Sequence, residues 1–353
     1  MKNYYFKTLD EFIQKYGNRQ ATWLLLVAEE TEFVHEDLKM LVAQCYGAIF
    51  PEIIYDRNHY KRGIIAKKVD TQPILLENIY NPNFDTLLLE KNKSMLVFVD
   101  GLSASIESFL FNLFEVVDED CIIFGGGAGK LTFEHDAVMF SPERFVKDAA
   151  LLIGLKEKLQ IGVQHGWKYL EGPLVVTSSD KNILKKINYK DAFSVYRKIV
   201  EEDSHKKITK DNFFEITKSY PLGIVTMYGE VIVRDPIFTE DGALVLVGFM
   251  PNNSIINILK GNKQDLLTAA SSAADIAINL ECKFNNVFIV DCISRVLFLE
   301  NSFEEEINII KDKVGSANLI GVLSLGEIAN TSKEYINFYN KTCVVGALCS
   351  SNN

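Results

Sequence analysis

Short apolar runs bounded by turn residues alternate along the chain with stretches of helical periodicity. Strand candidates include residues 23–27, 95–99, 121–124, 286–290 and 319–322, and several of them lack any alternation of polar and apolar side chains. A strand of that kind is buried on both faces, as happens when helices cover a sheet. The pattern therefore predicts an α/β fold, with α+β as the alternative.

Two stretches with helical spacing indicate what covers the sheets. Residues 103–114 carry an apolar stripe that includes Ile106, Phe109 and Leu113. Residues 263–280 are rich in alanine, and their apolar side chains also recur at helical spacing. An apolar stripe on a helix faces the core, so we expect both helices to pack against sheets.

A unit of strand, turn, helix, strand and glycine turn occurs once in each half of the chain. The first copy starts at residues 97–101 and ends at residues 125–129, and the second starts at residues 288–292 and ends at residues 321–327. The repetition predicts two pseudo-repeated parts with mixed sheets flanked by helices. Chance recurrence is the alternative, because such units are common in α/β proteins.

The charge balance excludes some partners. The chain of 353 residues is 48% hydrophobic and carries a formal net charge of -10. It can bury a large core, but a nucleic-acid backbone or an anionic membrane would repel it. Asp10 and Glu11 lie where a secretory signal needs apolar residues, and no segment approaches the ~20 apolar residues of a membrane-spanning helix. We expect a soluble cytoplasmic protein with no nucleic-acid partner and no membrane insertion.

Six cysteines are scattered over the chain, at positions 45, 121, 282, 292, 343 and 349. No Cys-x-x-Cys pair occurs, which leaves a disulfide framework or a structural zinc site without support. We expect reduced thiols, most of them small core residues.

The glycine-rich segment at residues 125–129 is followed by Lys130 but does not form a phosphate loop. Phe124 occupies the first glycine position of that motif, and Leu131 stands where it needs serine or threonine. Glycines such as Gly126 and Gly127 would instead let the backbone approach a ligand or another strand. A tight turn is the alternative.

His165 is the most interesting of the five histidines, because it lies between Gln164 and Gly166 and next to Trp167. An imidazole beside an indole can supply a metal ligand, a haem ligand or a stacking wall. A hydrogen-bonded structural histidine is the commoner case.

Cys292 and Arg295 follow a strongly apolar strand, where α/β sheets expose ligand-contacting side chains. A thiol near a guanidinium can become a nucleophilic thiolate. The alternative is a packed cysteine beside an arginine that pairs with a carboxylate in bidentate fashion. We favour the second interpretation, because no histidine lies near Cys292 in the sequence.

A second polar strand end carries Ser324, Gly326 and Glu327, and Asn340 precedes the last predicted strand. Ser324 and Glu327 are three residues apart, which is also the spacing of a helix-capping box. Asn340 is also suited to a simple turn.

Taken together, these segments resemble the FIST family of sensory domains, which has an N-terminal and a C-terminal part. The resemblance is carried by residues 126–129, 162–167, 290–295, 321–329 and 338–342. It implies a division into residues 1–189 and 190–353. It also implies recognition of small intracellular ligands such as amino acids, with the signal passed to kinases, chemotaxis-type receptors or cyclic-nucleotide machinery.

The sequence departs from the family where the first half usually has small hydroxyl residues, because residues 43–47 read Ala-Gln-Cys-Tyr-Gly here. Bulkier side chains have replaced small hydroxyl residues there, so we do not expect the first half of the chain to bind the usual family ligand in the usual way. Both FIST parts account for the chain, so the resemblance implies a separate output protein, such as a histidine kinase or a chemotaxis-type receptor.

The combined prediction is a non-enzymatic sensor with a pocket for a small polar ligand. Its side chains come from strand ends, and backbone amides complete it; the residues are Asp100, Gly126, Gly127, His165, Cys292, Arg295, Ser324, Gly326, Glu327 and Asn340. We predict no cofactor. Two alternatives remain: a haem-binding nitric oxide sensor with His165 as the axial ligand, and an enzyme with Cys292 as nucleophile.

Overall fold

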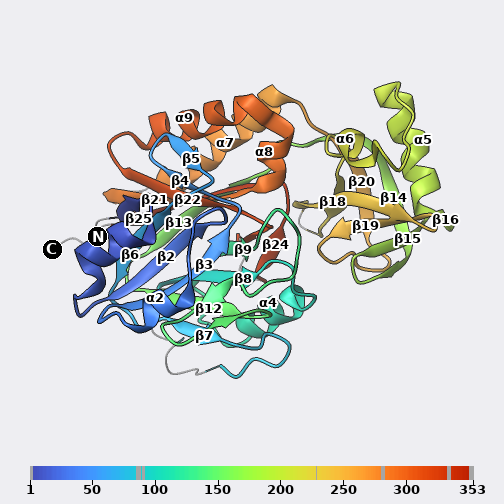
Figure 1. Ribbon diagram of the computed structural model, residues 1–353. Coiled ribbons are helices and arrows are strands. Elements are labelled where there is room, and N and C mark those ends of the chain that lie inside the picture. Colours follow the sequence, from blue (N-terminus) through green and yellow to red (C-terminus); the bar gives the residue numbers. More distant parts are fainter. Residues whose placement is uncertain are drawn as a thin grey trace.

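The computed structural model describes residues 3–84, 89, 92–227, 229–279, 283–331 and 335–349. These residues form four sheets. Three sheets build a main body from the chain before residue 168 and after residue 260, and the fourth lies in a small domain formed by the residues between (Figure 1). The mixture of helices with several sheets confirms the predicted α/β class.

Three six-stranded sheets make up the main body. The first has the order β1 (Asn3–Phe6), β6 (Ile64–Val69), β2 (Thr22–Ala28), β3 (Gln44–Phe50), β10 (Met139–Phe140) and β11 (Phe145–Val146). The second has the order β7 (Ile74–Leu76), β12 (Ala150–Leu155), β8 (Ser94–Asp100), β9 (Ile122–Ala128), β23 (Glu327–Ala329) and β24 (Asn337–Tyr339). The third has the order β13 (Leu159–Gln164), β25 (Cys343–Cys349), β21 (Phe284–Cys292), β22 (Asn318–Ser324), β4 (Glu52–Tyr55) and β5 (Asn58–Tyr60).

All three sheets follow one plan. A parallel pair linked through a helix forms the centre of each sheet, namely β2 with β3, β8 with β9 and β21 with β22. An antiparallel strand returns beside the first member of each pair, namely β6, β12 and β25. A hairpin from another unit completes the far edge, because β10 pairs with β3, β23 with β9 and β4 with β22. The main body is therefore a threefold repeat whose units exchange hairpins.

The two copies predicted from the sequence are the second and third units of this repeat. The first unit, centred on β2 and β3, lacks the features that reveal the other two. Its connecting helix α2 (His35–Lys39) has only five residues, and no run of glycines follows β3. A short helix with one buried residue gives no readable periodicity.

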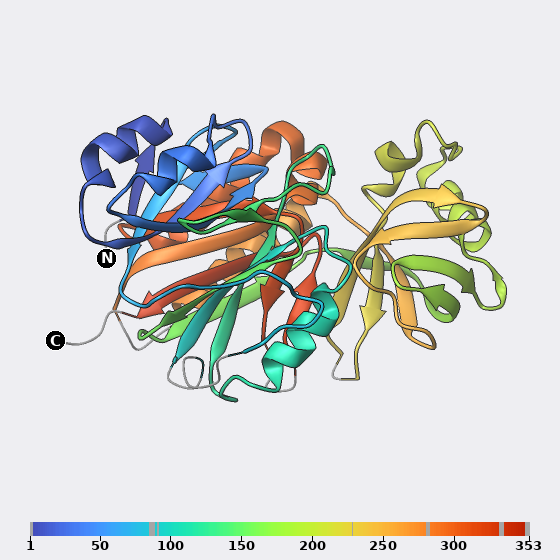
Figure 2. The same ribbon diagram turned by 60° about the horizontal axis from the view of Figure 1, so that its bottom comes forward.

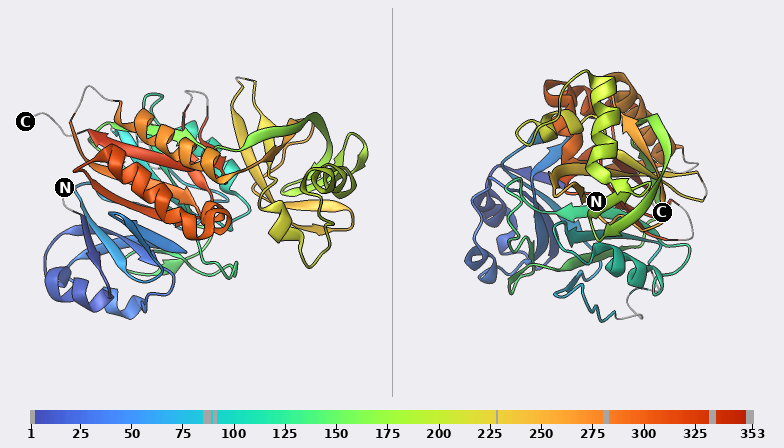
Figure 3. Two further views of the ribbon diagram at one scale, coloured as in Figure 1. Left: turned by 90° about the horizontal axis from the view of Figure 1, so that it is seen from above. Right: turned by 90° about the vertical axis from the view of Figure 1, so that its right-hand side faces the viewer.

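Helices cover the outer face of each sheet, while the inner faces meet at a common core (Figure 3). The first sheet is covered by α1 (Leu9–Phe12), the π-helix Ile13–Gly17 and α2, the second by α4 (Ile106–Phe114), and the third by α7 (Lys263–Ile278), α8 (Ile293–Leu299) and α9 (Phe303–Val314). Phe50, Phe98 and Phe288 bring one aromatic ring from each sheet to the common core. Burial on both faces explains the strands without polar alternation.

The small domain is antiparallel throughout its seven described strands, and it stands beside the main body (Figure 2). The strand order is β14 (Lys168–Asp180), β20 (Ile255–Lys260), β17 (Leu222–Val225), β18 (Val231–Glu240), β19 (Ala243–Val247), β15 (Ile183–Ile187) and β16 (Lys190–Asp191). Helices α5 (Ala192–Ser204) and α6 (Phe213–Thr217) complete it. The buried Tyr196 on α5 donates a hydrogen bond to the Tyr220 carbonyl at 2.6 Å inside the domain's own core.

The cysteines depart in part from the expected reduced set. Cys45, Cys121, Cys292 and Cys343 are buried free thiols, but Cys349 is disulfide-bonded. Cys282 lies outside the described residues. In the part of the chain that the structure describes, no helix has the length and apolar character needed to cross a membrane.

Candidate functional site at the domain junction

The main body and the small domain meet through buried polar contacts. Arg234 on β18 donates from Nη1 to the Phe338 carbonyl at 3.0 Å, and the Tyr339 hydroxyl donates to Oε1 of Glu230 at 2.7 Å. Phe338 and Tyr339 belong to β24, next to the turn that leads into β25. This turn and the ends of β21 and β22 therefore face β18 across the junction.

A buried ion pair crosses the junction between Lys341 and Asp235. Lys341 Nζ lies 3.1 Å from Asp235 Oδ2, and both side chains are at most 1% exposed. The ammonium also donates to the Lys218 carbonyl at 3.0 Å and lies 4.9 Å from the centre of the Trp167 ring. Burial raises the pKa of Asp235, although the Lys341 ammonium and the Ser294 hydroxyl oppose that shift. Such a pair couples the two bodies, because separating it leaves two uncompensated charges.

Glu327 lies next to this pair, at the start of β23. Its Oε1 accepts a hydrogen bond from the Ser324 hydroxyl at 2.7 Å, and its Oε2 accepts from the Thr342 amide at 3.2 Å. Both side chains are fully buried and lie in strands, so the capping-box interpretation does not apply. Burial raises the pKa of Glu327 to about 8, and the two hydrogen bonds oppose the shift. The carboxyl therefore carries a proton at neutral pH.

Several buried oxygen atoms at this junction have no hydrogen-bond partner among the described residues, and two of them belong to facing elements of the two bodies. These two are Oδ1 of Asn340 and Oδ1 of Asp235, each in a side chain that is 1% exposed. Asn340 uses its Nδ2 for the Tyr339 carbonyl at 3.0 Å, and Asp235 uses its other oxygen for Lys341 and Ser294. Leaving an acceptor buried and unpaired costs about 1–3 kcal/mol. These two atoms are thus suited to accept hydrogen bonds from a bound molecule.

Arg295 corrects the expectation that its guanidinium pairs with a ligand. The side chain is fully buried and pairs with Glu306 and Asp291, at 2.5 Å from Nη2 to Oε2 and 3.1 Å from Nε to Oδ1 respectively. Its remaining N–H groups donate to main-chain carbonyls, with 2.8 Å to His165 and 3.1 Å to Leu266. A further contact joins Nη1 to the Lys341 carbonyl at 3.5 Å, so every nitrogen of the guanidinium has a partner within the protein. Arg295 positions the strand ends around it.

Cys292 is a packed thiol. It is 3% exposed, and burial raises its pKa well above the ordinary value, with the Glu327 charge adding to the shift. A nucleophilic cysteine needs the opposite shift and solvent access. The geometry does not favour the alternative of an enzyme with Cys292 as nucleophile.

His165 does not fit the axial ligand of a haem in this arrangement. Its Nδ1 accepts a hydrogen bond from the Trp167 amide at 3.0 Å, which places the single ring proton of the neutral imidazole on Nε2. Burial, with help from the Arg295 charge, lowers the pKa of His165 to about 4, so the ring is neutral. The nitrogen that would bind iron is then protonated, and the other is engaged by the main chain.

Asp100 belongs to a neighbouring polar cluster. Its Oδ2 lies 2.8 Å from His135 Nε2, and Asp148 Oδ1 lies 3.6 Å from the same nitrogen. Ligand atoms of these three residues all lie within 4.8 Å of one another, so they could hold a divalent cation. Leu325, between Ser324 and Gly326, lies against Gly101, which follows Asp100 in the chain. The structure thus divides the predicted pocket into two clusters at one end of the main body.

The glycines are used for strand packing, which corrects the prediction of a ligand-facing loop. Gly126 and Gly127 lie within β9, and a Cβ on Gly126 would come within 2.7 Å of Val290 Cγ1. The Gly127 amide donates to the Gly326 carbonyl at 2.8 Å. Gly326 itself has φ +111, and a Cβ there would lie 2.2 Å from the Phe338 ring. These amides are therefore taken up by neighbouring strands.

The sequence reasoning missed three residues of the junction cluster, namely Asp235, Glu306 and Lys341. Arg234 and Asp235 are adjacent charges inside an otherwise apolar strand, and that feature could have marked Asp235. Lys341 lies in residues 338–342, which carry part of the family resemblance, and its φ of +52 cannot be inferred from the sequence. Glu306 is one of three consecutive acidic residues that open α9, and only the structure shows that it faces inward.

A polar cluster between two bodies of an α/β protein is where small-molecule sites commonly lie. The chain matches the FIST N domain over residues 16–190 and the FIST C domain over residues 192–330, and it belongs to the FIST family. FIST domains are sensory domains of signal-transduction proteins and are generally non-enzymatic. No curated protein matches the chain.

Proposed function

We propose that this chain is a cytoplasmic, non-enzymatic sensor that binds a small polar ligand at the domain junction and signals to a separate output protein. The observation that carries the proposal is the pair of buried, unpaired acceptors, Asn340 Oδ1 and Asp235 Oδ1. An acceptor lacking a donor is complemented by a ligand with N–H groups. The ammonium of a free amino acid has this chemistry.

Domain movement would carry the signal. The cluster is buried, so a ligand enters only when the small domain shifts relative to the main body. Lys341, Asp235, Glu230 and Arg234 provide the contacts that such a shift would break and remake. A ligand changes this equilibrium only through different affinities for the two arrangements. A histidine kinase or chemotaxis-type receptor would read the resulting change in surface.

The test combines native mass spectrometry of freshly purified protein with a thermal-shift screen of the twenty amino acids. We expect a bound mass, or a shift in melting temperature with at least one amino acid. Asn340→Leu should abolish that shift, because it replaces the carboxamide by an apolar group of similar volume. Asn58→Leu, at an exposed position on β5, is the matched control. Absence of any bound mass and of any shift, or equal shifts in Asn340→Leu and wild type, would remove the junction as the site.

A further inference from the structure

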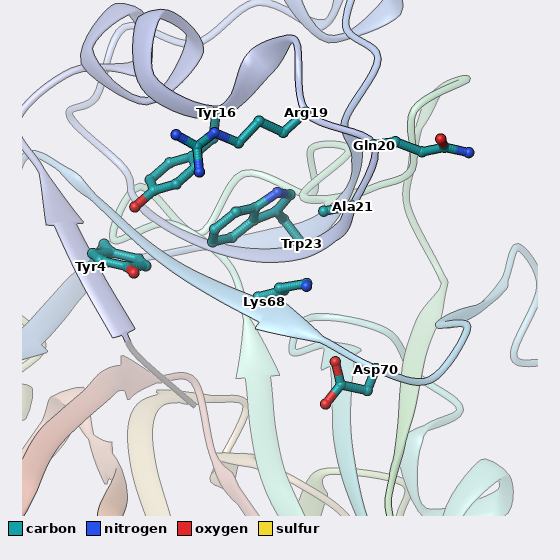
Figure 4. Close-up of a pocket in the computed structure, with 8 residues that line it drawn as sticks. All are labelled: Tyr4, Tyr16, Arg19, Gln20, Ala21, Trp23, Lys68 and Asp70. Atoms are coloured by element: carbon teal, nitrogen blue, oxygen red, sulfur yellow. The ribbon is translucent and has the colours of Figure 1, made fainter.

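A pocket lies on the outer side of the first sheet, beside the π-helix Ile13–Gly17. It has a volume of about 350 Å³, and Tyr4, Tyr16, Arg19, Gln20, Ala21, Trp23, Lys68 and Asp70 line it. Figure 4 shows Tyr4, Tyr16 and Trp23 grouped together, from β1, the π-helix and β2, with the other residues coming from the turn before β2, from β6 and from the position just after β6. Small-molecule sites begin at about 300 Å³, so the pocket can hold a compact organic ligand.

Three aromatic rings form one wall of this pocket. The ring centres of Tyr16 and Trp23 are 4.6 Å apart, and Tyr4 lies 5.2 Å from Tyr16. Trp23 is only 3% exposed, and Phe12 packs on it at 5.5 Å, so the wall is held by the core behind it. A planar aromatic ligand gains both apolar burial and ring contacts on such a wall.

The charges around the rings select the sign of the ligand. Arg19 and Lys68 line the pocket with two positive charges against the single negative charge of Asp70. In Figure 4 the Trp23 indole lies between the Arg19 side chain and Lys68. The Arg19 guanidinium stacks 5.0 Å from the Tyr16 ring centre, and Lys15 Nζ lies 5.3 Å from that of Tyr4. These cations lie close to the rings, so the pocket disfavours a cationic ligand even though the chain as a whole carries a net charge of -10.

The pocket wall also holds an unused hydrogen-bond donor. Trp23 Nε1 is buried and has no acceptor among the described residues. In Figure 4 this edge of the indole is turned towards Ala21, where the exposed side chains of Arg19 and Gln20 can shift to admit a ligand atom. A buried donor without an acceptor favours a ligand that supplies one.

We propose that this pocket binds a planar aromatic carboxylate, with the ring on the Tyr4, Tyr16 and Trp23 wall and the carboxylate paired with Arg19 and Lys68. Arginine suits this role because its planar fork binds a carboxylate through two hydrogen bonds. The site is distinct from the domain junction, and its ligand differs in chemistry from the one proposed there.

The test is isothermal titration of the full chain with three probes of one shape: 2-naphthoate, the neutral 2-naphthamide and the cationic 2-naphthylmethylammonium. We expect saturable binding of naphthoate, about tenfold weaker binding of naphthamide because the charge-assisted hydrogen bonds are lost, and no saturable binding of the cation. Arg19→Gln and Lys68→Gln should each weaken naphthoate binding about tenfold. The matched control is Lys39→Gln, an exposed lysine on α2, which should leave it unchanged.

Trp23→Phe keeps an aromatic wall but removes the N–H donor, so it should weaken naphthoate binding. The melting temperature of this variant, measured in parallel, shows whether it is folded. Arg19 and Lys68 are exposed, so their substitutions test the site even if Trp23→Phe fails to fold. Equal affinities for naphthoate and naphthamide, unchanged binding in Arg19→Gln, or the lack of saturable naphthoate binding would each overturn the proposal.

Discussion

The Ser324 hydroxyl donates a 2.7 Å hydrogen bond to Glu327 where both side chains are fully buried, and burial nevertheless raises the pKa of the Glu327 carboxyl to about 8. A hydrogen bond to a carboxylate lowers its pKa, so burial here outweighs the bond. The native protein therefore holds a proton that an unfolded chain releases near pH 4.5. This difference links folding stability to pH.

Glu327→Gln should flatten the pH dependence of the free energy of unfolding. Between about pH 4.5 and 8 the native wild type binds more protons at this site than the unfolded chain, so stability falls as pH rises through that window and levels off above it. The contribution reaches at most about 1.4 kcal/mol per pH unit. Urea unfolding at pH 5.5, 6.5, 7.5 and 8.5 measures it, with the exposed Glu143→Gln as control. Parallel profiles for wild type and Glu327→Gln would show that the native carboxyl is not protonated.

Arg295→Met should destabilise the protein by about 3–5 kcal/mol, because it leaves Glu306 and Asp291 as buried charges without a partner. The matched control is Lys263→Met, which breaks the solvent-exposed pair with Glu305 and should cost less than about 1 kcal/mol. Denaturant unfolding of both variants gives the comparison. A loss below 1 kcal/mol in Arg295→Met would mean that the pair contributes no net stability and that Arg295 is available for another role.

Cys292 should resist iodoacetamide in the native protein at pH 7.5 and react readily in urea. Its thiol is buried, and its raised pKa leaves almost no thiolate to react. Peptide mass mapping after timed labelling measures the rate at each cysteine. Selective native labelling of Cys292 ahead of the other thiols would restore the nucleophile interpretation.

Sequence patterns predicted the fold class and buried strands such as β2, β8 and β21, because burial on both faces leaves an apolar run that is visible in the sequence. Other strands, among them β3, β6 and β12, were missed. Apolar side chains recurring at helical spacing placed the helix α7 almost to its bounds, since the predicted range was residues 263–280 and the helix is Lys263–Ile278. The threefold repeat was seen only in part, since the equivalence of β2 with β8 and β21 lies in strand pairing and not in shared residues.

Proximity of several predicted site residues could be inferred from the sequence, but their hydrogen-bond and ion-pair partners could not. Cys292, Arg295, Ser324, Glu327 and Asn340 lie at one junction, as their strand-end positions suggested. The partners of Arg295 come from α9 and from the strand itself, and the partner of Lys341 comes from the small domain. Pairing of side chains that are distant in the sequence depends on how the domains pack, which the local pattern does not encode.

Gly162→Ala should destabilise the protein more than Gly315→Ala. A Cβ on Gly162 in β13 would lie 2.0 Å from the carbonyl oxygen of Ala273, so α7 would have to move away from the third sheet. A close-packed core relieves such overpacking only by shifting side chains and backbone, and we expect the free energy of unfolding to fall by more than about 3 kcal/mol. Gly315 ends α9 with open space around it, but its φ of +59 and ψ of -122 are strained for any residue with a Cβ, so we expect alanine there to cost about 1–3 kcal/mol. Thermal and urea unfolding of the two variants test this order. Equal losses would show that the α7 packing against β13 adapts at little cost, and the close approach of helix and sheet would then not be what requires glycine at position 162.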